Sequence, residues 1–152
     1  MSKLNTCHCL IVEDNAETRN WLATCVQSAF SEATLVSAED LASARKTLLQ
    51  NNFDLALVDL GLPDGSGLDL IAELKREQGD CHVIVATIYD DDKNLFTALR
   101  SGANGYILKD QDKDKIVGYL KGIQHNRPAL SDASSQRLID HFNNSGSDLA
   151  DS

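Results

Sequence analysis

Short apolar runs alternate along the chain with segments in which apolar residues recur at helical spacing. The runs lie at 8–13, 33–37, 54–59, 81–87 and 104–108. Each run has the length of a strand and is apolar enough to be buried on both faces, as strands of parallel sheets are. Strands that alternate with helices predict an α/β domain, with a doubly wound parallel sheet of five strands and five helices.

End signals support the helical segments. Asn15 precedes the first helix as a candidate cap, Asp112 precedes the fifth, and Gly102 ends the fourth. Residues 37–40 (SAED) and 66–69 (SGLD) each place an acid three residues after a serine, as a capping box requires. We therefore expect the second and third helices to begin at these two segments.

Charge and cysteine content narrow the function classes. With a net charge of −9, the 152-residue chain lacks the basic face that binding nucleic acid by itself would need, but it suits a cation site. It has no apolar run long enough to span a bilayer and no cleavable signal peptide, so we expect a cytoplasmic protein without a membrane partner. The cysteines show no disulfide spacing, which favours a reducing compartment.

Polar residues gather where the predicted strands end. The stretch LALVDLGLPDGSG (55–67) carries one acid, Asp59, at the end of a buried strand and before a turn rich in glycine and proline. Glu13 and Asp14 end the first strand, Thr87 the fourth, and Lys109 the fifth. The carboxyl ends of parallel strands form the ligand-binding edge of an open α/β sheet, so we expect these side chains to converge.

Other interpretations of single residues remain open. An acid at a strand end is usually a turn or cap residue, and residues 13–14 could simply cap the first helix. The stretch Cys7-His8-Cys9 has a ligand-like composition, but strand alternation sends His8 to the face opposite both cysteines, which disfavours zinc. The case for a site at Asp59 therefore depends on the whole set of residues.

In order and spacing, the motifs VED, VDLGLPDGSG, VAT and GANGYILKD resemble the receiver domain of two-component response regulators over residues 8–127. The resemblance implies a flavodoxin-like fold with strand order 2-1-3-4-5. It also implies that Asp59 accepts a phosphoryl group from a sensor histidine kinase. Such a domain catalyses its own phosphorylation and dephosphorylation and is not an enzyme with a separate substrate.

Three like charges in one pocket need a cation. Mg²⁺ prefers hard oxygen ligands, so we expect Asp14 and Asp59 as direct ligands, the Gly61 carbonyl as a third and Glu13 through water. Phosphoryl transfer requires positioning and charge neutralisation, which Mg²⁺ and Lys109 would supply while Asp59 attacks.

The resemblance also assigns a switch. The Thr87 hydroxyl would bond the new phosphoryl group, and Tyr106 would be the aromatic side chain that moves inward in response. Phosphorylation would then change an output surface and could promote a homodimer.

Two positions depart from the common receiver pattern. Asp110 follows Lys109 where proline is frequent, and the sequence GYILKD is familiar in the NarL/FixJ (LuxR-type) subgroup. Ile88 follows Thr87 where most receivers carry a small residue. We expect Ile88 to act as an access gate over Asp59, giving slow labelling by small donors and a long-lived phosphoryl group.

The C-terminal segment supports the same subgroup. Residues 127–142 resemble the stretch after helix five in such regulators, with Ser131 as a cap and an apolar helix face. That face comprises Leu138, Ile139 and Phe142. Residues 143–152 (NNSGSDLADS) are polar and predict a flexible linker. We therefore expect a receiver domain over 1–127 and a linker helix with a tail over 128–152.

Several outputs are compatible with this sequence. In full-length members of the subgroup a helix-turn-helix domain follows, so the chain would control DNA binding through a part that it lacks. A stand-alone receiver acting on a protein partner and a receiver that works without phosphorylation are the alternatives. A phosphatase of the haloacid dehalogenase type is disfavoured, because Gly61 stands where the second acid would be needed.

Overall fold

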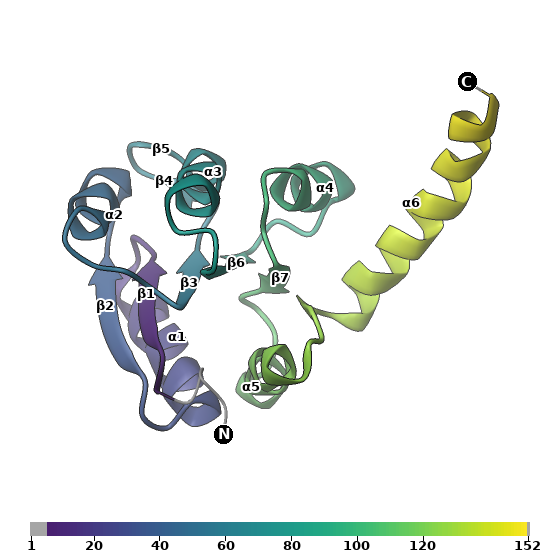
Figure 1. Ribbon diagram of the computed structural model, residues 1–152. Helices are drawn as coiled ribbons and strands as arrows, with labels where there is room; N and C mark the ends of the chain where they lie inside the picture. The colour runs from purple at the N-terminus through teal and green to yellow at the C-terminus, as the bar shows by residue number, and fades with distance from the viewer. Residues whose placement is uncertain (1–5, 152) are drawn as a thin grey trace.

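The computed structural model describes residues 6–151, with side-chain environments for residues 6–144 (Figure 1). Within this part of the chain, strands and helices alternate through five βα units and then continue into a further strand and helix. The units comprise β1 (His8–Val12), α1 (Ala16–Ala29), β2 (Thr34–Ala38), α2 (Leu41–Leu48), β3 (Leu55–Val58), α3 (Gly67–Glu77), β6 (His82–Thr87), α4 (Asp92–Arg100), β7 (Gly105–Leu108) and α5 (Lys113–Gly122).

Shorter elements complete the chain. A two-stranded hairpin, β4 (Gly61–Leu62) and β5 (Gly65–Ser66), lies between β3 and α3. After α5 come the 3₁₀ turn η2 (Ile123–His125), the strand β8 (Ala129–Leu130) and the helix α6 (Asp132–Asp151).

The described strands form a six-stranded parallel sheet in the order β2-β1-β3-β6-β7-β8. The first five correspond to the predicted flavodoxin-like order 2-1-3-4-5, which is confirmed. The prediction of a five-stranded sheet was wrong by one strand, because β8 pairs Ala129 with Gly105 and Leu130 with Tyr106. A strand of two residues is too short to show an alternating pattern in the sequence.

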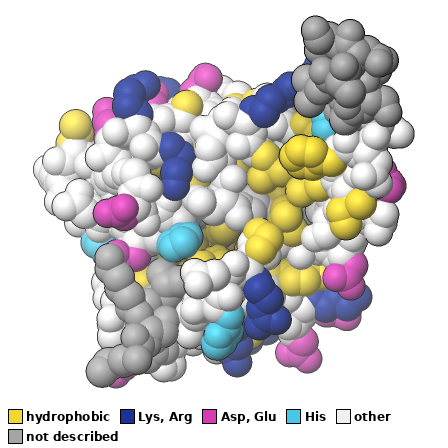
Figure 2. Space-filling model, turned by 45° about the vertical axis from the view of Figure 1, so that its right-hand side comes forward, with side chains coloured by type: hydrophobic (Ala, Val, Ile, Leu, Met, Phe, Trp, Pro, Cys, Tyr) yellow, Lys and Arg dark blue, Asp and Glu magenta, His cyan; other side chains and the backbone are white. Residues whose placement is uncertain are grey.

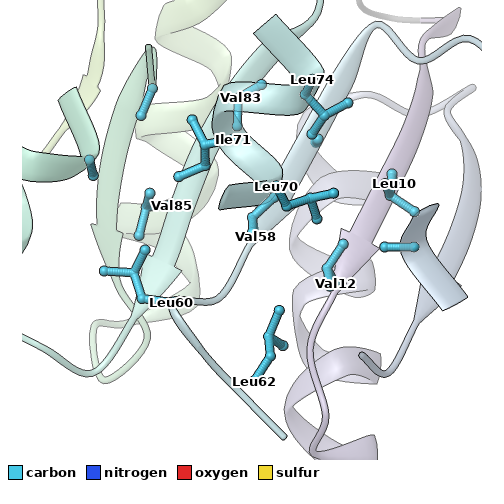
Figure 3. Packing of buried hydrophobic residues seen from close by; sticks show 14 of the residues in the cluster. Leu10, Val12, Val58, Leu60, Leu62, Leu70, Ile71, Leu74, Val83 and Val85 are labelled. Atoms are coloured by element: carbon cyan, nitrogen blue, oxygen red, sulfur yellow. The ribbon is translucent and has the colours of Figure 1, made fainter. Parts of the chain in front are cut away.

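Helices α2, α3 and α4 cover one face of the sheet, and α1 and α5 cover the other (Figure 1). Alternation along each strand supplies both layers. In β1, Leu10 and Val12 join the cluster under α2, α3 and α4, whereas Cys9 and Ile11 join the cluster under α1 and α5. Figure 3 shows the first cluster, in which aliphatic side chains of β1, β3, β6 and α3 meet.

Two helix starts test the predicted caps. Asn15 caps α1, accepting a hydrogen bond from the Thr18 N–H at 2.9 Å, as expected. The capping box of α2 lies three residues later than predicted: Asp40 and Ser43 form it, rather than Ser37 and Asp40. Ser37 is instead paired in β2, so its backbone belongs to the sheet.

The turn behind Asp59 is held tightly at both ends. The Asp64 carboxylate accepts hydrogen bonds from the N–H groups of Leu41 and Ala42 at 2.8 and 3.0 Å, which ties the hairpin to the start of α2. Ser66 caps α3, and a Cβ atom at Gly67 would lie 2.1 Å from the Asp59 carbonyl oxygen. Glycine at 67 therefore allows α3 to begin directly against the backbone of Asp59.

Helix α6 begins as predicted and ends later. The buried Ser131 hydroxyl accepts a hydrogen bond from the Ser134 N–H at 3.0 Å, consistent with its expected role as a cap. The helix then continues to Asp151, through residues that composition had predicted to be a flexible linker. Figure 1 shows α6 extending away from the sheet. Of its expected apolar face, Leu138 packs on the core, while Ile139 and Phe142 are exposed.

The four cysteines lie in the core, and His8 lies on the opposite face of the sheet from Cys9. Cys7, Cys9, Cys25 and Cys81 are buried free thiols, and His8 lies against Phe53 on the other side of the sheet from Cys9, as alternation predicted. Among residues 6–151, every helix is too short or too polar to cross a bilayer.

Candidate functional site

Side chains from the carboxyl ends of three strands meet around one lysine. Glu13 follows β1, Asp59 follows β3 and Lys109 follows β7. The Lys109 ammonium group donates hydrogen bonds to Glu13 Oε1 at 2.5 Å and to Asp59 Oδ2 at 3.0 Å. The predicted convergence at this edge of the sheet is therefore present in the structure, with Lys109 bridging the two buried carboxylates.

Asp14 completes an acidic site with Glu13 and Asp59. One carboxylate oxygen of each residue lies within 4.8 Å of the others. Glu13 and Asp59 are buried and Asp14 is exposed, so the site opens to solvent on one side. Three carboxylates at this separation form a donor set that suits a hard divalent cation. Gly61 lies at the start of β4, two residues after Asp59.

Burial governs the electrostatics of the acidic site. It raises the pKa of Glu13, against the lowering effect of the hydrogen bonds from Lys109 and the Asn15 N–H. Burial alone would lower the pKa of Lys109, but its hydrogen bonds to Glu13 and Asp59 outweigh this effect, and that pKa is raised. The site thus favours a positive charge next to its carboxylates.

Arg19 supports the acidic site from helix α1. Its guanidinium group donates a hydrogen bond to the Glu13 carbonyl oxygen at 2.8 Å, across the turn that carries Asp14. Sequence reasoning missed this residue, because an arginine in the first turns of a helix carries no motif. Its position six residues after Glu13 follows from the short turn between β1 and α1.

Thr87 and Tyr106, the predicted switch pair, are both hydrogen-bonded to the backbone of Tyr89. The Tyr89 N–H donates to Thr87 Oγ1 at 3.3 Å, and the Tyr106 hydroxyl donates to the Tyr89 carbonyl oxygen at 2.6 Å. Tyr106 is only 1% exposed, so its ring occupies an inward position, and burial raises the pKa of its hydroxyl. The switch roles of both residues stay predictions.

Ile88 and Tyr89 follow Thr87 in the loop after β6. Ile88 is 68% exposed and lines a shallow groove with Trp21 and Lys109. The Tyr89 side chain lies beside Gly61: a Cβ atom added at Gly61 would lie 3.2 Å from the Tyr89 hydroxyl oxygen. Sequence analysis missed Tyr89, since an aromatic residue in a loop gives no signal. The gate role of Ile88 stays a prediction.

The model of the response regulator receiver domain matches residues 9–121, which is most of the chain. This chain belongs to the response regulator receiver family. The match spans β1 to α5 and includes every residue of the acidic site, so the recognition based on sequence motifs is confirmed.

Curated relatives extend the similarity. The chain is 27% identical over 141 residues to the oxygen regulatory protein NreC of Staphylococcus carnosus, a match that covers 91% of this chain. It is 26% identical over 131 residues, or 86% of this chain, to a nitrate/nitrite response regulator protein homolog of Haemophilus influenzae. The receiver chain spans 65% and 63% of the lengths of these relatives.

Solved structures show the same fold. A LuxR-family two-component response regulator from Aurantimonas sp. SI85-9A1 superimposes with a TM-score of 0.79 at 21% identity, covering 90% of this chain and 97% of that one. A response regulator from Burkholderia pseudomallei, solved with a phosphorylated aspartic acid, a calcium ion and citrate, gives 0.68 at 25% identity, covering 88% and 72%.

Proposed function

We propose that this receiver accepts a phosphoryl group from a sensor histidine kinase on Asp59. The observation that carries the proposal is the placement of Asp59. Its carboxylate lies at the carboxyl end of β3, with an oxygen within 4.8 Å of two further acids, and accepts a hydrogen bond from Lys109. A carboxylate held between a cation site and an ammonium group is suited to attack a phosphoryl group.

In the transfer, an Asp59 carboxylate oxygen forms a bond to phosphorus while the bond from phosphorus to the kinase histidine nitrogen breaks. Lys109, already bonded to Asp59, would shift toward the phosphoryl oxygens and balance their charge. Asp14, Asp59 and the Gly61 carbonyl would hold Mg²⁺, with Glu13 acting through water. The bound ion would neutralise charge on the acids and on the transferred group.

The signal would leave through Thr87. In the structure its hydroxyl accepts a hydrogen bond from the Tyr89 N–H. On phosphorylation the hydroxyl would turn to the phosphoryl group, and the hydrogen bond from Tyr89 would be lost. Tyr106 and the loop between β6 and α4 would then respond together, because the backbone of Tyr89 is hydrogen-bonded to both Thr87 and Tyr106. The output surface would comprise α4, β7 and α5.

The direct experiment is incubation with Mg²⁺ and acetyl phosphate, followed by intact-mass measurement. We expect one phosphoryl group per chain, stable in acid and released by hydroxylamine as an acyl phosphate. A phosphorylation-independent receiver would remain at its unmodified mass.

The output belongs to the same proposal. Because the relatives are longer than this chain, we propose that the receiver controls a LuxR-type DNA-binding domain, helped by a homodimer that forms on phosphorylation. The net charge of −9 supports DNA contact through such a domain rather than through this chain. A stand-alone receiver acting on a protein partner is the alternative. A kinase partner that phosphorylates inside the cell implies a cytoplasmic location.

Magnesium should stabilise the protein through the acidic site. We expect the thermal midpoint to rise with Mg²⁺ concentration, because an ion that binds only the folded state stabilises it by mass action. Asp14→Asn should weaken this rise by removing one exposed ligand. Thermal unfolding across a Mg²⁺ titration tests this, with Asp114→Asn on α5 as the matched control. A wild-type midpoint that ignores millimolar Mg²⁺ would refute the metal site.

Phosphorylation should be visible at a distance from Asp59. We expect amide chemical shifts to change at Thr87, Tyr89 and Tyr106 and over the surface of α4, β7 and α5. The reason is that Thr87 gives up its bond to the Tyr89 N–H. Two-dimensional NMR of the protein with and without beryllofluoride measures this. Shift changes confined to the residues around Asp59 would show that the switch is not connected as proposed.

A further inference from the structure

The β6–α4 loop (residues 88–91) connects the acidic site with the C-terminal helix. At its start, the backbone of Tyr89 is fixed by Thr87 and Tyr106. One residue later, the Asp90 carboxylate accepts a hydrogen bond from the guanidinium group of Arg137 on α6. A displacement of α6 would therefore act on the residue next to Tyr89.

Arg137 bridges one acid of the β6–α4 loop and one at the start of α4. Besides its contact with Asp90, its Nε lies 3.5 Å from Asp92 Oδ1. The Arg137 side chain is 33% exposed, so neither ion pair is buried, and an isolated pair at this exposure would hold α6 weakly. The structure shows further contacts that fix its position.

Apolar contacts hold α6 at the same place. The ring of His141 lies against that of Phe96 on α4, tilted by 33° with centroids 4.2 Å apart, and Leu138 packs on the core. Ser131 and Ser134 are buried where the helix begins. Figure 2 shows hydrophobic side chains gathered on one face of the molecule. The side chains of Arg137 and His141 thus join α6 to the β6–α4 loop and to α4.

The side chain of Tyr89 lies at the end of the β6–α4 loop that faces the acidic site. Its hydroxyl lies at Gly61, two residues from Asp59, in space that a larger residue at position 61 would fill. At 44% exposure the ring is partly open to solvent, and the backbone that carries it sets where the ring can reach. That backbone is fixed by Thr87 and Tyr106, and the neighbouring Asp90 by Arg137.

We propose that α6 limits the access of phosphoryl donors to Asp59, with Arg137 as a positioning residue that holds the β6–α4 loop so that Tyr89 narrows the opening beside Gly61. This inference rests on Asp59 being the phosphoacceptor. It assigns to the C-terminal helix a role within the receiver, in addition to connecting it to an effector. Movement of α6 would then change the rate at which Asp59 is phosphorylated.

Labelling by acetyl phosphate is the step that reports this access. An Asp59 oxygen bonds to phosphorus, the bond from phosphorus to the acetyl oxygen breaks, and acetate leaves with the electron pair. The donor has to reach Asp59 in line with that breaking bond, past the side chains that border the opening. Tyr89 is one of these side chains, since its hydroxyl lies beside Gly61.

The test measures the initial rate of labelling at fixed Mg²⁺ by intact mass. We expect Arg137→Ala to be labelled several-fold faster than the wild type and Arg137→Lys to stay close to it. Loss of a positive charge alone would slow an anionic donor, so a faster rate is the opposite of a simple charge effect. Arg100→Ala, an exposed arginine on α4, is the matched control and should leave the rate unchanged.

A second set of variants tests the route. Tyr89→Ala should accelerate labelling as Arg137→Ala does, Tyr89→Phe should not, and the Tyr89→Ala/Arg137→Ala double variant should gain little over either. Ile88→Ala in the same assay separates this route from a gate at Ile88. An unchanged rate in Arg137→Ala, or additive effects in the double variant, would overturn the inference while phosphorylation of Asp59 stands. A wild type that is never labelled would overturn both.

Discussion

Asp59→Asn should abolish labelling of the protein by acetyl phosphate. The amide keeps the shape of the side chain but lacks the carboxylate that attacks phosphorus. The fold should persist, because Asp59 lies at the end of β3 and its backbone N–H donates to the Val12 carbonyl oxygen irrespective of the side chain. Intact mass before and after hydroxylamine treatment measures the result, and circular dichroism checks the fold.

Asp69→Asn is the matched control for this substitution. Asp69 is an exposed acid in the first turn of α3 and lies outside the acidic site, so labelling should equal that of the wild type. If the Asp59→Asn protein still gained one hydroxylamine-labile phosphoryl group, another carboxylate would be the acceptor. Digestion and mass mapping would then find it, and the assignment of Asp59 would be wrong.

Lys109→Met should destabilise the metal-free protein by about 3 kcal/mol, the lower end of the range for breaking a buried ion pair. The lysine bonds both Glu13 and Asp59, which are almost completely buried. Without it, two carboxylates are left close together in a site that disfavours their charge. Urea unfolding in EDTA at neutral pH measures the loss, with Lys115→Met, an exposed lysine of α5, as the control.

Mg²⁺ and pH should both modify this loss. Added Mg²⁺ should restore part of the stability, since a divalent cation can replace the missing positive charge. Burial raises the pKa of Glu13, so the folded protein takes up a proton there at a higher pH than the unfolded chain does. The destabilisation should therefore shrink as the pH falls through that raised pKa and grow as the pH rises. A Lys109→Met protein as stable as the wild type in EDTA would contradict the bridge.

Much of the fold could be predicted from the sequence because the central parallel strands are buried on both faces. Strands such as β3, with all four residues buried, appear in the sequence as continuous apolar runs. What escaped was set by tertiary contacts: β8 exists because Ala129 and Leu130 lie beside β7. The continuation of α6 to Asp151 passes through polar residues whose composition favours disorder.

The part of the candidate site that could be predicted is the part that the order of the strands brings together. Glu13, Asp59 and Lys109 follow strands whose carboxyl ends necessarily meet, so their positions in the sequence sufficed. Tyr89 and Arg137 act through loops and helix packing, which depend on side-chain directions that no spacing encodes. In the sequence Ile88 is the residue next to Thr87, but in the structure it is the Tyr89 side chain that borders the space at Gly61.

Gly67 sets a limit on which sequences can carry this chemistry. Any side chain at this position would place a carbon atom 2.1 Å from the Asp59 carbonyl oxygen, so either α3 or the nucleophile would have to shift. Such a substitution would leave all three acids in the sequence and still displace the Asp59 carboxylate from the position that phosphoryl transfer requires. A screen of random variants for lost signalling should therefore recover position 67 together with Asp59, although glycine contributes no reactive atom.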